Sequence, residues 1–151
     1  MINFIILSFF ITFCTCFILS IILLASDRKY FSFALFNINL CIWSFSYGNH
    51  LIASSENEAL LYSKITLSSL VFVPYFFFKT CRFMSNFKIS KFYRRLENVI
   101  VVILASLMFT PIMTNGVRSF LGLKFVPEVT LFWYIFFIYL LVVVIFSFFI
   151  M

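Results

Sequence analysis

Residues 37–50 read NINLCIWSFSYGNH and lie inside an apolar run that begins near Phe31. The stretch brings three asparagines, two serines, a tyrosine, a glycine and the only histidine of the chain into a segment otherwise suited to lipid. An unpaired polar group in hydrocarbon costs several kcal/mol, so these groups need partners on neighbouring helices or in a wet cavity. Their distribution around a helix therefore decides how the chain folds.

On a helix of about 3.6 residues per turn, this stretch separates into stripes. Small residues let a neighbouring helix approach closely, and an Ile/Phe stripe between the other two can face lipid. The small-residue face, predicted to pack against another helix, consists of Asn37, Cys41, Ser44 and Gly48. The polar face, the candidate ligand-binding face, consists of Asn39, Trp43, Ser46, Tyr47 and His50.

The composition is that of a membrane protein. Of 151 residues, 64% are hydrophobic and 11% are charged, and 25 are phenylalanine, whereas soluble domains are about half apolar and a quarter charged. The net charge is +6, but the basic residues cluster between apolar runs. That arrangement indicates membrane topology and anionic headgroups, with the lipid bilayer as partner and no nucleic acid.

A helix needs about 20 apolar residues to cross the hydrocarbon. The sequence predicts an all-α, polytopic membrane protein with a single transmembrane domain over residues 1–151. Pro74 and Pro111 interrupt two of its runs and predict kinks, because proline removes a backbone hydrogen bond. The predicted spans are residues 3–26, 31–53, 65–84, 99–114 and 129–151.

The charges of the connections predict the topology. Glu56 and Glu58 lie in the second connection, whereas the first and third are basic. Because an excess of Lys and Arg marks the cytoplasmic side, we expect the amino terminus outside and the carboxyl terminus in the cytoplasm. The last run ends without a basic flank, so we expect a truncated protein or one that continues further. The predicted cytoplasmic basic loop contains Lys88, Lys91, Arg94 and Arg95.

The chain carries no recognisable catalytic motif. It has no nucleophile–base pair, no glycine-rich phosphate loop and no paired carboxylates. Cys14, Cys16, Cys41 and Cys81 form no CxxC motif and are interpreted as small packing residues. We therefore predict a protein that is not an enzyme and has no metal or cofactor.

Two interpretations of the polar face remain open. In the first, Asn39 and Ser46 bond to neighbouring helices, while Tyr47 and His50 lie at the outer interface. In the second, the face lines an outward-facing pocket for an unknown small molecule, with His50 at its mouth. Histidine titrates near neutral pH, so His50 is also a candidate proton sensor.

Three consecutive segments resemble a known family. They are WSFSYGNHLIASS at 43–55, ENEALLYSKI at 56–65 and LSSLVFVPYFFFKTCRF at 67–83. Their order resembles the amino-terminal region, with seven transmembrane helices, of bacterial sensor histidine kinases, and the similarity covers about five of those helices. It implies an input module in the bacterial inner (plasma) membrane that passes a signal to an output domain of a two-component system. The matching positions are Trp43, Ser44, Tyr47, Lys64 and Pro74.

The sequence thus favours a membrane sensory module without an output domain. The alternative is a small accessory or assembly protein that binds other transmembrane helices, or a second copy of itself, through the face around Cys41, Ser44 and Gly48. A transporter or channel fragment is disfavoured because the spans carry no charged residue near their middle, where coupled ions usually require one.

Overall fold

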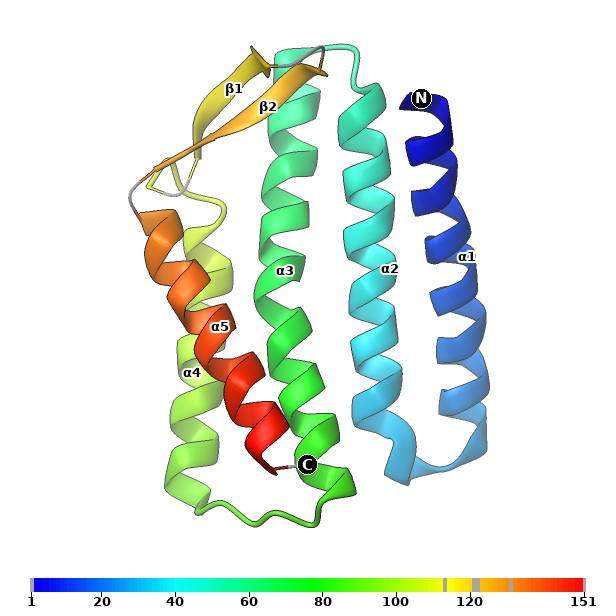
Figure 1. Ribbon diagram of the computed structural model, residues 1–151, viewed down its shortest axis with the longest axis vertical. Coiled ribbons are helices and arrows are strands. Elements are labelled where there is room, and N and C mark those ends of the chain that lie inside the picture. The colour runs from blue at the N-terminus through cyan, green and yellow to red at the C-terminus, as the bar shows by residue number, and fades with distance from the viewer. Residues whose placement is uncertain (1, 113, 121–122, 131, 151) are drawn as a thin grey trace.

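The computed structural model describes residues 2–112, 114–120, 123–130 and 132–150. Five helices and one β-hairpin make up this part of the chain (Figure 1). The helical class predicted from the sequence is confirmed, and the hairpin is an addition to it. The elements are α1 (Ile2–Ser26), η1 (Arg28–Tyr30), α2 (Phe31–Ile52), α3 (Glu56–Met84), α4 (Lys91–Leu107), β1 (Thr114–Phe120), β2 (Leu123–Val129) and α5 (Phe132–Ile150).

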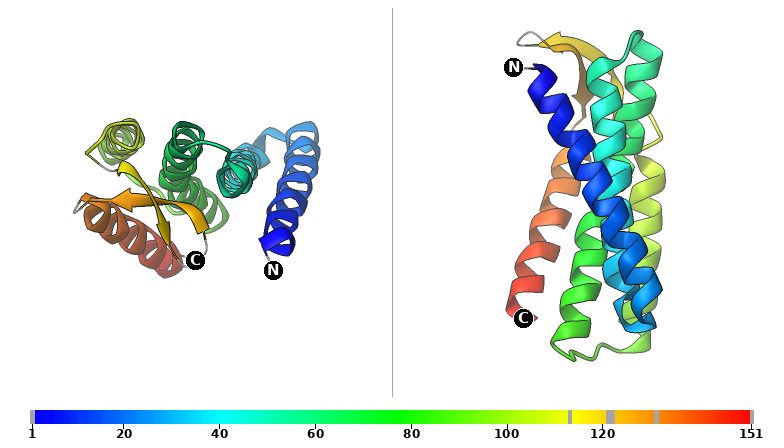
Figure 2. Two further views of the ribbon diagram at one scale, coloured as in Figure 1. Left: turned by 90° about the horizontal axis from the view of Figure 1, so that it is seen from above. Right: turned by 90° about the vertical axis from the view of Figure 1, so that its right-hand side faces the viewer.

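Helix α3 is the centre of the bundle. It packs against α2 on one side and against α4 and α5 on the other, while α1 packs on the far side of α2 (Figures 1 and 2). The amino terminus and the hairpin lie at one end, called here the hairpin end. The carboxyl terminus and the α3–α4 connection lie at the other, called the basic end.

Helix α3 begins earlier than the predicted span of 65–84. Ser55 caps it by accepting a hydrogen bond from the Glu58 amide at 3.3 Å. The Glu58 carboxylate in turn accepts from the Ser54 amide at 2.9 Å. The helix therefore starts with a capped, charged turn. The predicted boundary followed the apolar run, which begins about two turns later in the helix. Pro74 lies inside α3.

Helix α4 differs at both ends from the predicted span of 99–114. The Ser90 hydroxyl accepts from the Tyr93 amide at 3.4 Å and caps α4, which begins at Lys91. Because α4 ends at Leu107, Pro111 follows the helix and cannot kink it. The prediction of a kink at Pro111 is therefore wrong.

Strands β1 and β2 form an antiparallel hairpin over the ends of α2 and α3 (Figure 2). The register pairs Thr114 with Val129 and Phe120 with Leu123. The sequence predicted helix and loop here, because the predicted spans of 99–114 and 129–151 leave residues 115–128 as a connection, with Pro127 just before the last span. In a two-stranded ribbon, one side of each strand has no ladder partner, so proline is tolerated.

A cluster of buried apolar side chains joins α3, α4 and α5. Because α3 contributes to it along several turns, the cluster fixes α4 and α5 on the same helix that contacts α2. Its members are Leu67, Val71, Tyr75, Val101, Ala105, Met108 and Phe136.

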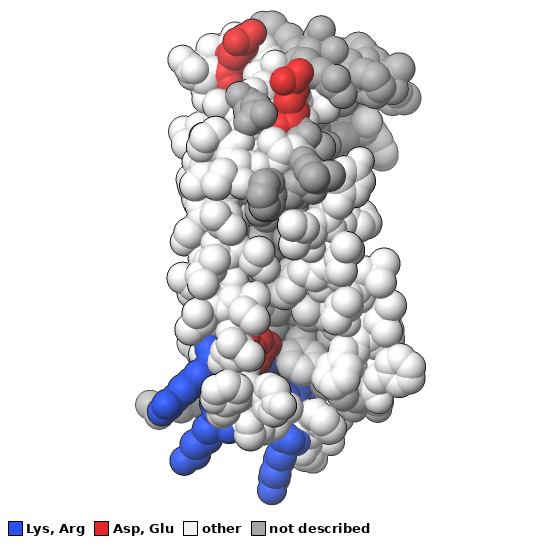
Figure 3. All heavy atoms as spheres, turned by 90° about the vertical axis from the view of Figure 1, so that its left-hand side faces the viewer, with Lys and Arg blue, Asp and Glu red and all other residues white. Residues whose placement is uncertain are grey.

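Large apolar side chains are also exposed along the outer faces of the helices, for example Leu7 and Ile11 on α1 and Ile138 on α5. On the face in Figure 3, Lys and Arg gather at the basic end, and two acidic patches lie at the hairpin end. The surface between them is largely uncharged. By length and composition, two of the described helices, Phe4–Ser26 and Glu56–Met84, are suited to cross a membrane.

Candidate functional site

A polar cluster at the hairpin end surrounds His50, which is 4% exposed. Its Nδ1 atom lies 3.0 Å from the Ala59 carbonyl oxygen and 3.0 Å from the Ser63 hydroxyl, both on α3. Its Nε2 atom lies 3.1 Å from the carbonyl oxygen of Phe125 in β2. This single side chain joins α2, α3 and the hairpin.

The hydrogen bonds of His50 depend on its protonation. Carbonyl oxygens only accept, and both ring nitrogens face one. A neutral ring with its proton on Nε2 donates to Phe125 and accepts from Ser63 at Nδ1. A protonated ring donates to both Ala59 and Phe125, so Ser63 loses its acceptor on the ring. Gaining a proton therefore changes how α2 is held to α3.

Two further polar side chains of α2 bond to α3. The Asn39 amide donates to the Ser69 carbonyl oxygen at 2.7 Å. The Ser46 hydroxyl accepts from the Thr66 hydroxyl at 3.0 Å and donates to the carbonyl of Ile42 at 2.6 Å. Both side chains are buried. The bonds to Ser69 and Thr66 are interhelical hydrogen bonds of the kind that the first interpretation of the polar face describes.

Trp43 and Tyr47 belong to a different contact. Their rings lie 5.6 and 4.7 Å from the ring of Phe9 on α1, measured between centroids. On a helical wheel these two residues lie to one side of Asn39 and His50, towards α1. The five residues of the predicted polar face therefore divide between two neighbouring helices, and the ring of Tyr47 lies 6.1 Å from that of His50 at the boundary between the two groups.

The small-residue face lies against α1. The Cys41 thiol donates to the Phe13 carbonyl oxygen at 3.5 Å. A Cβ atom added to Gly48 would meet the ring of Phe10 at 3.6 Å, an ordinary contact distance. Ser44 is fully buried, and its hydroxyl has no hydrogen-bond partner among the described residues. Asn37 bonds within α2, to the carbonyl of Phe33 at 2.8 Å.

The predicted pocket with His50 at its mouth differs from the observed arrangement, because α3 and β2 enclose that side chain. A cavity of about 340 Å³ lies elsewhere, between α2 and α3. Asn39, Ser68 and Ser69 give this cavity its polar groups, and the rest of its wall is apolar. Asn39, of the predicted polar face, therefore borders a space for a small molecule, and Ser46 borders a separate apolar cavity of about 400 Å³.

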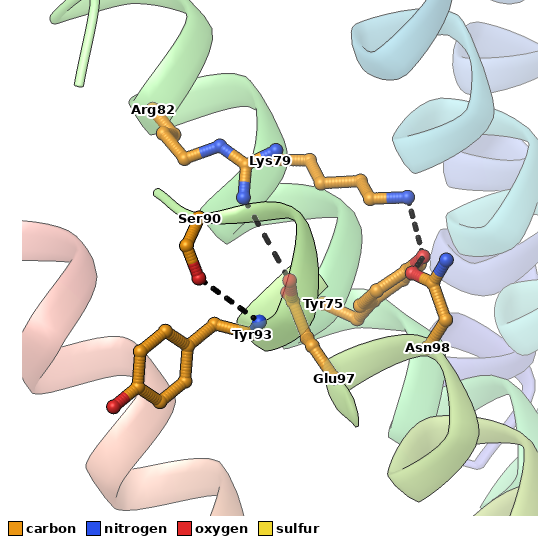
Figure 4. A network of polar contacts seen from close by, with 7 residues as sticks. All are labelled: Tyr75, Lys79, Arg82, Ser90, Tyr93, Glu97 and Asn98. Carbon is orange, nitrogen blue, oxygen red and sulfur yellow. Dashed lines mark hydrogen bonds and ion pairs between the residues drawn. The ribbon is translucent and has the colours of Figure 1, made fainter. Parts of the chain in front are cut away.

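A second polar network lies towards the basic end and joins α3 to α4 (Figure 4). The Tyr75 hydroxyl donates to the Asn98 side-chain oxygen at 2.6 Å. The Lys79 ammonium donates to the Tyr75 hydroxyl, and its nitrogen lies 4.2 Å from the centre of that ring. Lys79 and Tyr75 are one helical turn apart on α3.

Arg82 and Glu97 make the neighbouring contact, with 3.7 Å between their charged atoms (Figure 4). Their side chains are only 16% and 21% exposed. At 3.7 Å the two groups attract each other but are too far apart for a hydrogen bond. Burial raises the pKa of Glu97, while the positive charges of Arg82 and Lys79 lower it; burial is the larger effect.

The predicted basic loop is mostly helical. Lys88 lies in the α3–α4 connection, whereas Lys91, Arg94 and Arg95 lie in the first turns of α4. The prediction that all four form a loop is wrong because the Ser90 cap starts the helix among them. All four side chains are exposed.

Sequence reasoning missed the α3 partners in both networks. Ala59, Ser63 and Thr66 recur at i, i+4 and i+7, and so do Tyr75, Lys79 and Arg82. That spacing places each group on one face of a helix, so it is a usable signal. No pattern indicated Glu97 and Asn98 as partners, because the contact depends on how α4 packs.

No protein-family model matches the chain, and no curated protein or solved structure matches it.

Proposed function

We propose that this chain is a multi-pass module of a bacterial inner membrane that receives a signal at its hairpin end and passes it to its basic end. The observation that carries this proposal is the position of α3. This one helix bonds to His50 near its start and to the Tyr75–Asn98 contact two-thirds along its length. A shift of α3 at one cluster therefore displaces its partners at the other.

Membrane insertion of all five helices is part of the proposal. Large apolar side chains cover the outer faces of α1 and α5, and such surfaces are rare on soluble monomers. Helix α2 is less apolar than α1, but its polar groups Asn39, Ser46 and His50 point to partners inside the bundle. Its lipid-facing stripe is still apolar, with Ile42 and Phe45 exposed.

The stimulus that the geometry supports best is protonation of His50, because the charged and neutral rings make different hydrogen bonds to α3. The basic end, which the proposal places in the cytoplasm by the positive-inside rule, presents the response to an output domain or partner. This role is that of an input module of a sensor histidine kinase, the family that the sequence resembles. A small-molecule stimulus in the cavity beside Asn39 is the competing input.

The test measures movement at the basic end of the chain in lipid nanodiscs. Spin labels are placed at Tyr30→Cys and Lys88→Cys, in the two connections at that end, after Cys14 and Cys16 are replaced by serine. We expect the distance distribution between the labels to change when the pH falls from about 8 to about 5, because a protonated ring no longer accepts from Ser63 at Nδ1. We expect no such change in His50→Gln.

Asn49→Ala is the matched control, because Asn49 bonds only to Phe45 in its own helix among the described residues. It should keep the response. A Glu97→Gln background removes any contribution from that carboxyl. An identical distribution at both pH values in the unmodified chain would contradict the proton input, and a response retained in His50→Gln would assign it elsewhere.

The alternative, an accessory protein that binds other helices, has one observation in its favour. Helix α1 packs mainly on α2, so much of its apolar surface has no protein neighbour. The face that the sequence suggested for a partner, around Cys41 and Gly48, is already covered by α1. A partner helix would therefore bind the outer face of α1. A double variant, Leu7→Ser with Ile11→Ser, that still inserts into the membrane would then no longer bind that partner.

A further inference from the structure

Two hollows meet at the basic end of the bundle. The first is a basic cavity of about 750 Å³ between the ends of α3 and α4. The second is an apolar groove of about 480 Å³ between α3, α4 and α5. Phe87 and Ile89, from the α3–α4 connection, border both of them. A single molecule can therefore extend from one hollow into the other across these two side chains.

The basic cavity is lined by five cationic side chains. Lys79 and Arg82 are already engaged, with Tyr75 and Glu97. Within the described residues, the side chains of the other three make no hydrogen bond or ion pair. These three are Lys88, Lys91 and Arg94.

The start of α4 adds to the positive potential. The amino-terminal end of a helix carries a partial positive charge, which favours acidic residues in the first turn. The first turn of α4 has no acidic residue, and Lys91 and Arg94 lie near it. This arrangement is unfavourable by itself and becomes favourable when an anion is bound there.

The groove has the opposite character. Phe78, Leu96, Val142 and Phe146 contribute to its walls, and its only charged side chain is Glu97. Glu97 lies beside Arg82, at the border with the basic cavity. The remaining surface suits a hydrocarbon chain.

We propose that these two hollows together bind one anionic phospholipid. Its phosphate headgroup lies among Lys88, Lys91 and Arg94, and one acyl chain lies in the groove between α4 and α5. A free phosphate would leave the groove empty, and a zwitterionic lipid would leave part of the positive charge unmatched. The charge distribution in Figure 3 places the cationic side chains at the end of the uncharged surface, where headgroups of a bilayer would lie.

The test is native mass spectrometry of the full chain in detergent, titrated with phosphatidylglycerol, phosphatidylcholine or glycerol phosphate. Glycerol phosphate provides the anionic group without the chain. We expect one phosphatidylglycerol to bind roughly tenfold more tightly than phosphatidylcholine, given the usual attraction of basic residues to anionic lipid. We expect no retained glycerol phosphate.

Arg94→Gln and Arg95→Gln form the matched pair. Both arginines are exposed in the same turn of α4, but only Arg94 lines the cavity. Arg94→Gln should reduce phosphatidylglycerol binding roughly fivefold, and Arg95→Gln should leave it within about twofold. Adding Lys91→Gln to Arg94→Gln should reduce binding further. Val142→Trp, which fills the groove, should weaken both lipids. Circular dichroism checks that each variant is folded.

Equal affinity for the two lipids would overturn the proposal. An equal loss of phosphatidylglycerol affinity in Arg95→Gln would also overturn it, because binding would then depend on surface charge alone. Unchanged lipid binding in folded Val142→Trp would overturn it as well. These results are independent of the pH response of His50. The lipid site and the signalling function can therefore fail separately.

Discussion

The Tyr75 hydroxyl of α3 donates a hydrogen bond of 2.6 Å to the Asn98 side-chain oxygen of α4, and Lys79 donates to the same hydroxyl (Figure 4). Three polar groups from two helices are thus linked through one phenol. Tyr75 is also part of the apolar core. The same side chain therefore connects the polar network to the core.

Removing this contact should destabilise the α3–α4 pair. We expect Tyr75→Phe and Asn98→Ala each to lower the free energy of unfolding by about 1 kcal/mol, with a coupling energy of about 0.5–1.5 kcal/mol. The measurement is a double-mutant cycle by unfolding in mixed detergent micelles. Tyr93→Phe is the control, because the exposed Tyr93 side chain makes no hydrogen bond among the described residues. Additive effects of the two variants would argue against the contact.

The two buried asparagines of α2 should differ. Asn39 reaches across to the Ser69 carbonyl of α3, whereas Asn37 bonds within its own helix. Asn39→Ala should therefore cost about 1 kcal/mol more unfolding free energy than Asn37→Ala. The same micelle titration measures both, and equal losses would show that the α2–α3 hydrogen bond adds no stability.

Ser44 and Ser46 offer a second comparison on the same helix. The buried Ser44 hydroxyl has no partner among the described residues, while Ser46 bonds to Thr66. We expect Ser44→Ala to be neutral or stabilising and Ser46→Ala to lower the unfolding free energy by about 1 kcal/mol. A destabilising Ser44→Ala would mean that the hydroxyl has a partner in the membrane.

Gly48 should tolerate a methyl group and no more. An added Cβ would lie 3.6 Å from Phe10, which is ordinary van der Waals contact. Gly48→Ala should therefore keep the stability or raise it by up to about 1 kcal/mol, because alanine favours helix. Gly48→Leu should separate α1 from α2, which a loss of cross-linking between cysteines placed on α1 and α2 would detect. Unchanged cross-linking in Gly48→Leu would show that α1 does not pack against Gly48.

Glu97 should make stability depend on pH. Its pKa is raised above the usual value of 4.5, chiefly by burial. For an acid with a raised folded-state pKa, the stabilising contribution is complete below the usual value and is lost as the pH rises through the raised one. The unmodified chain should therefore lose stability relative to Glu97→Gln as the pH rises from about 4.

Thermal unfolding across that range measures the difference. Arg82→Gln should steepen the dependence, because the charge of Arg82 lowers the pKa of Glu97. If the unmodified chain instead gains stability relative to Glu97→Gln with rising pH, the ion pair outweighs burial.

The sequence predicted most of the helices because hydrophobic runs and helices coincide in α1, α2 and α5. It misplaced the starts of α3 and α4, since a hydropathy criterion finds the apolar part of a helix and ignores capped polar turns such as Ser55–Glu58 and Ser90–Tyr93. The hairpin was missed because its apolar residues follow neither period clearly. The hairpin packs against α2 and α3, and such tertiary contacts leave no local pattern in the sequence.

The sequence predicted the α2 residues of the candidate site and did not predict the residues that they contact. The periodicity of α2 identified Asn39, Ser46 and His50 as groups in need of partners. It could not identify Phe125, because that contact is a backbone carbonyl 75 positions along the chain. Periodicity also grouped Trp43 and Tyr47 with them, because a helical wheel shows directions without showing which helix occupies each direction.

The peripheral position of α1 bears on biogenesis. Its contacts are with α2, the next helix to be synthesised, so this pair can associate before the remainder of the chain has left the ribosome. Helix α3 also packs against α5, so part of its surface has no protein neighbour until α5 is translated. The α3–α5 interface therefore forms later in synthesis than the α1–α2 interface.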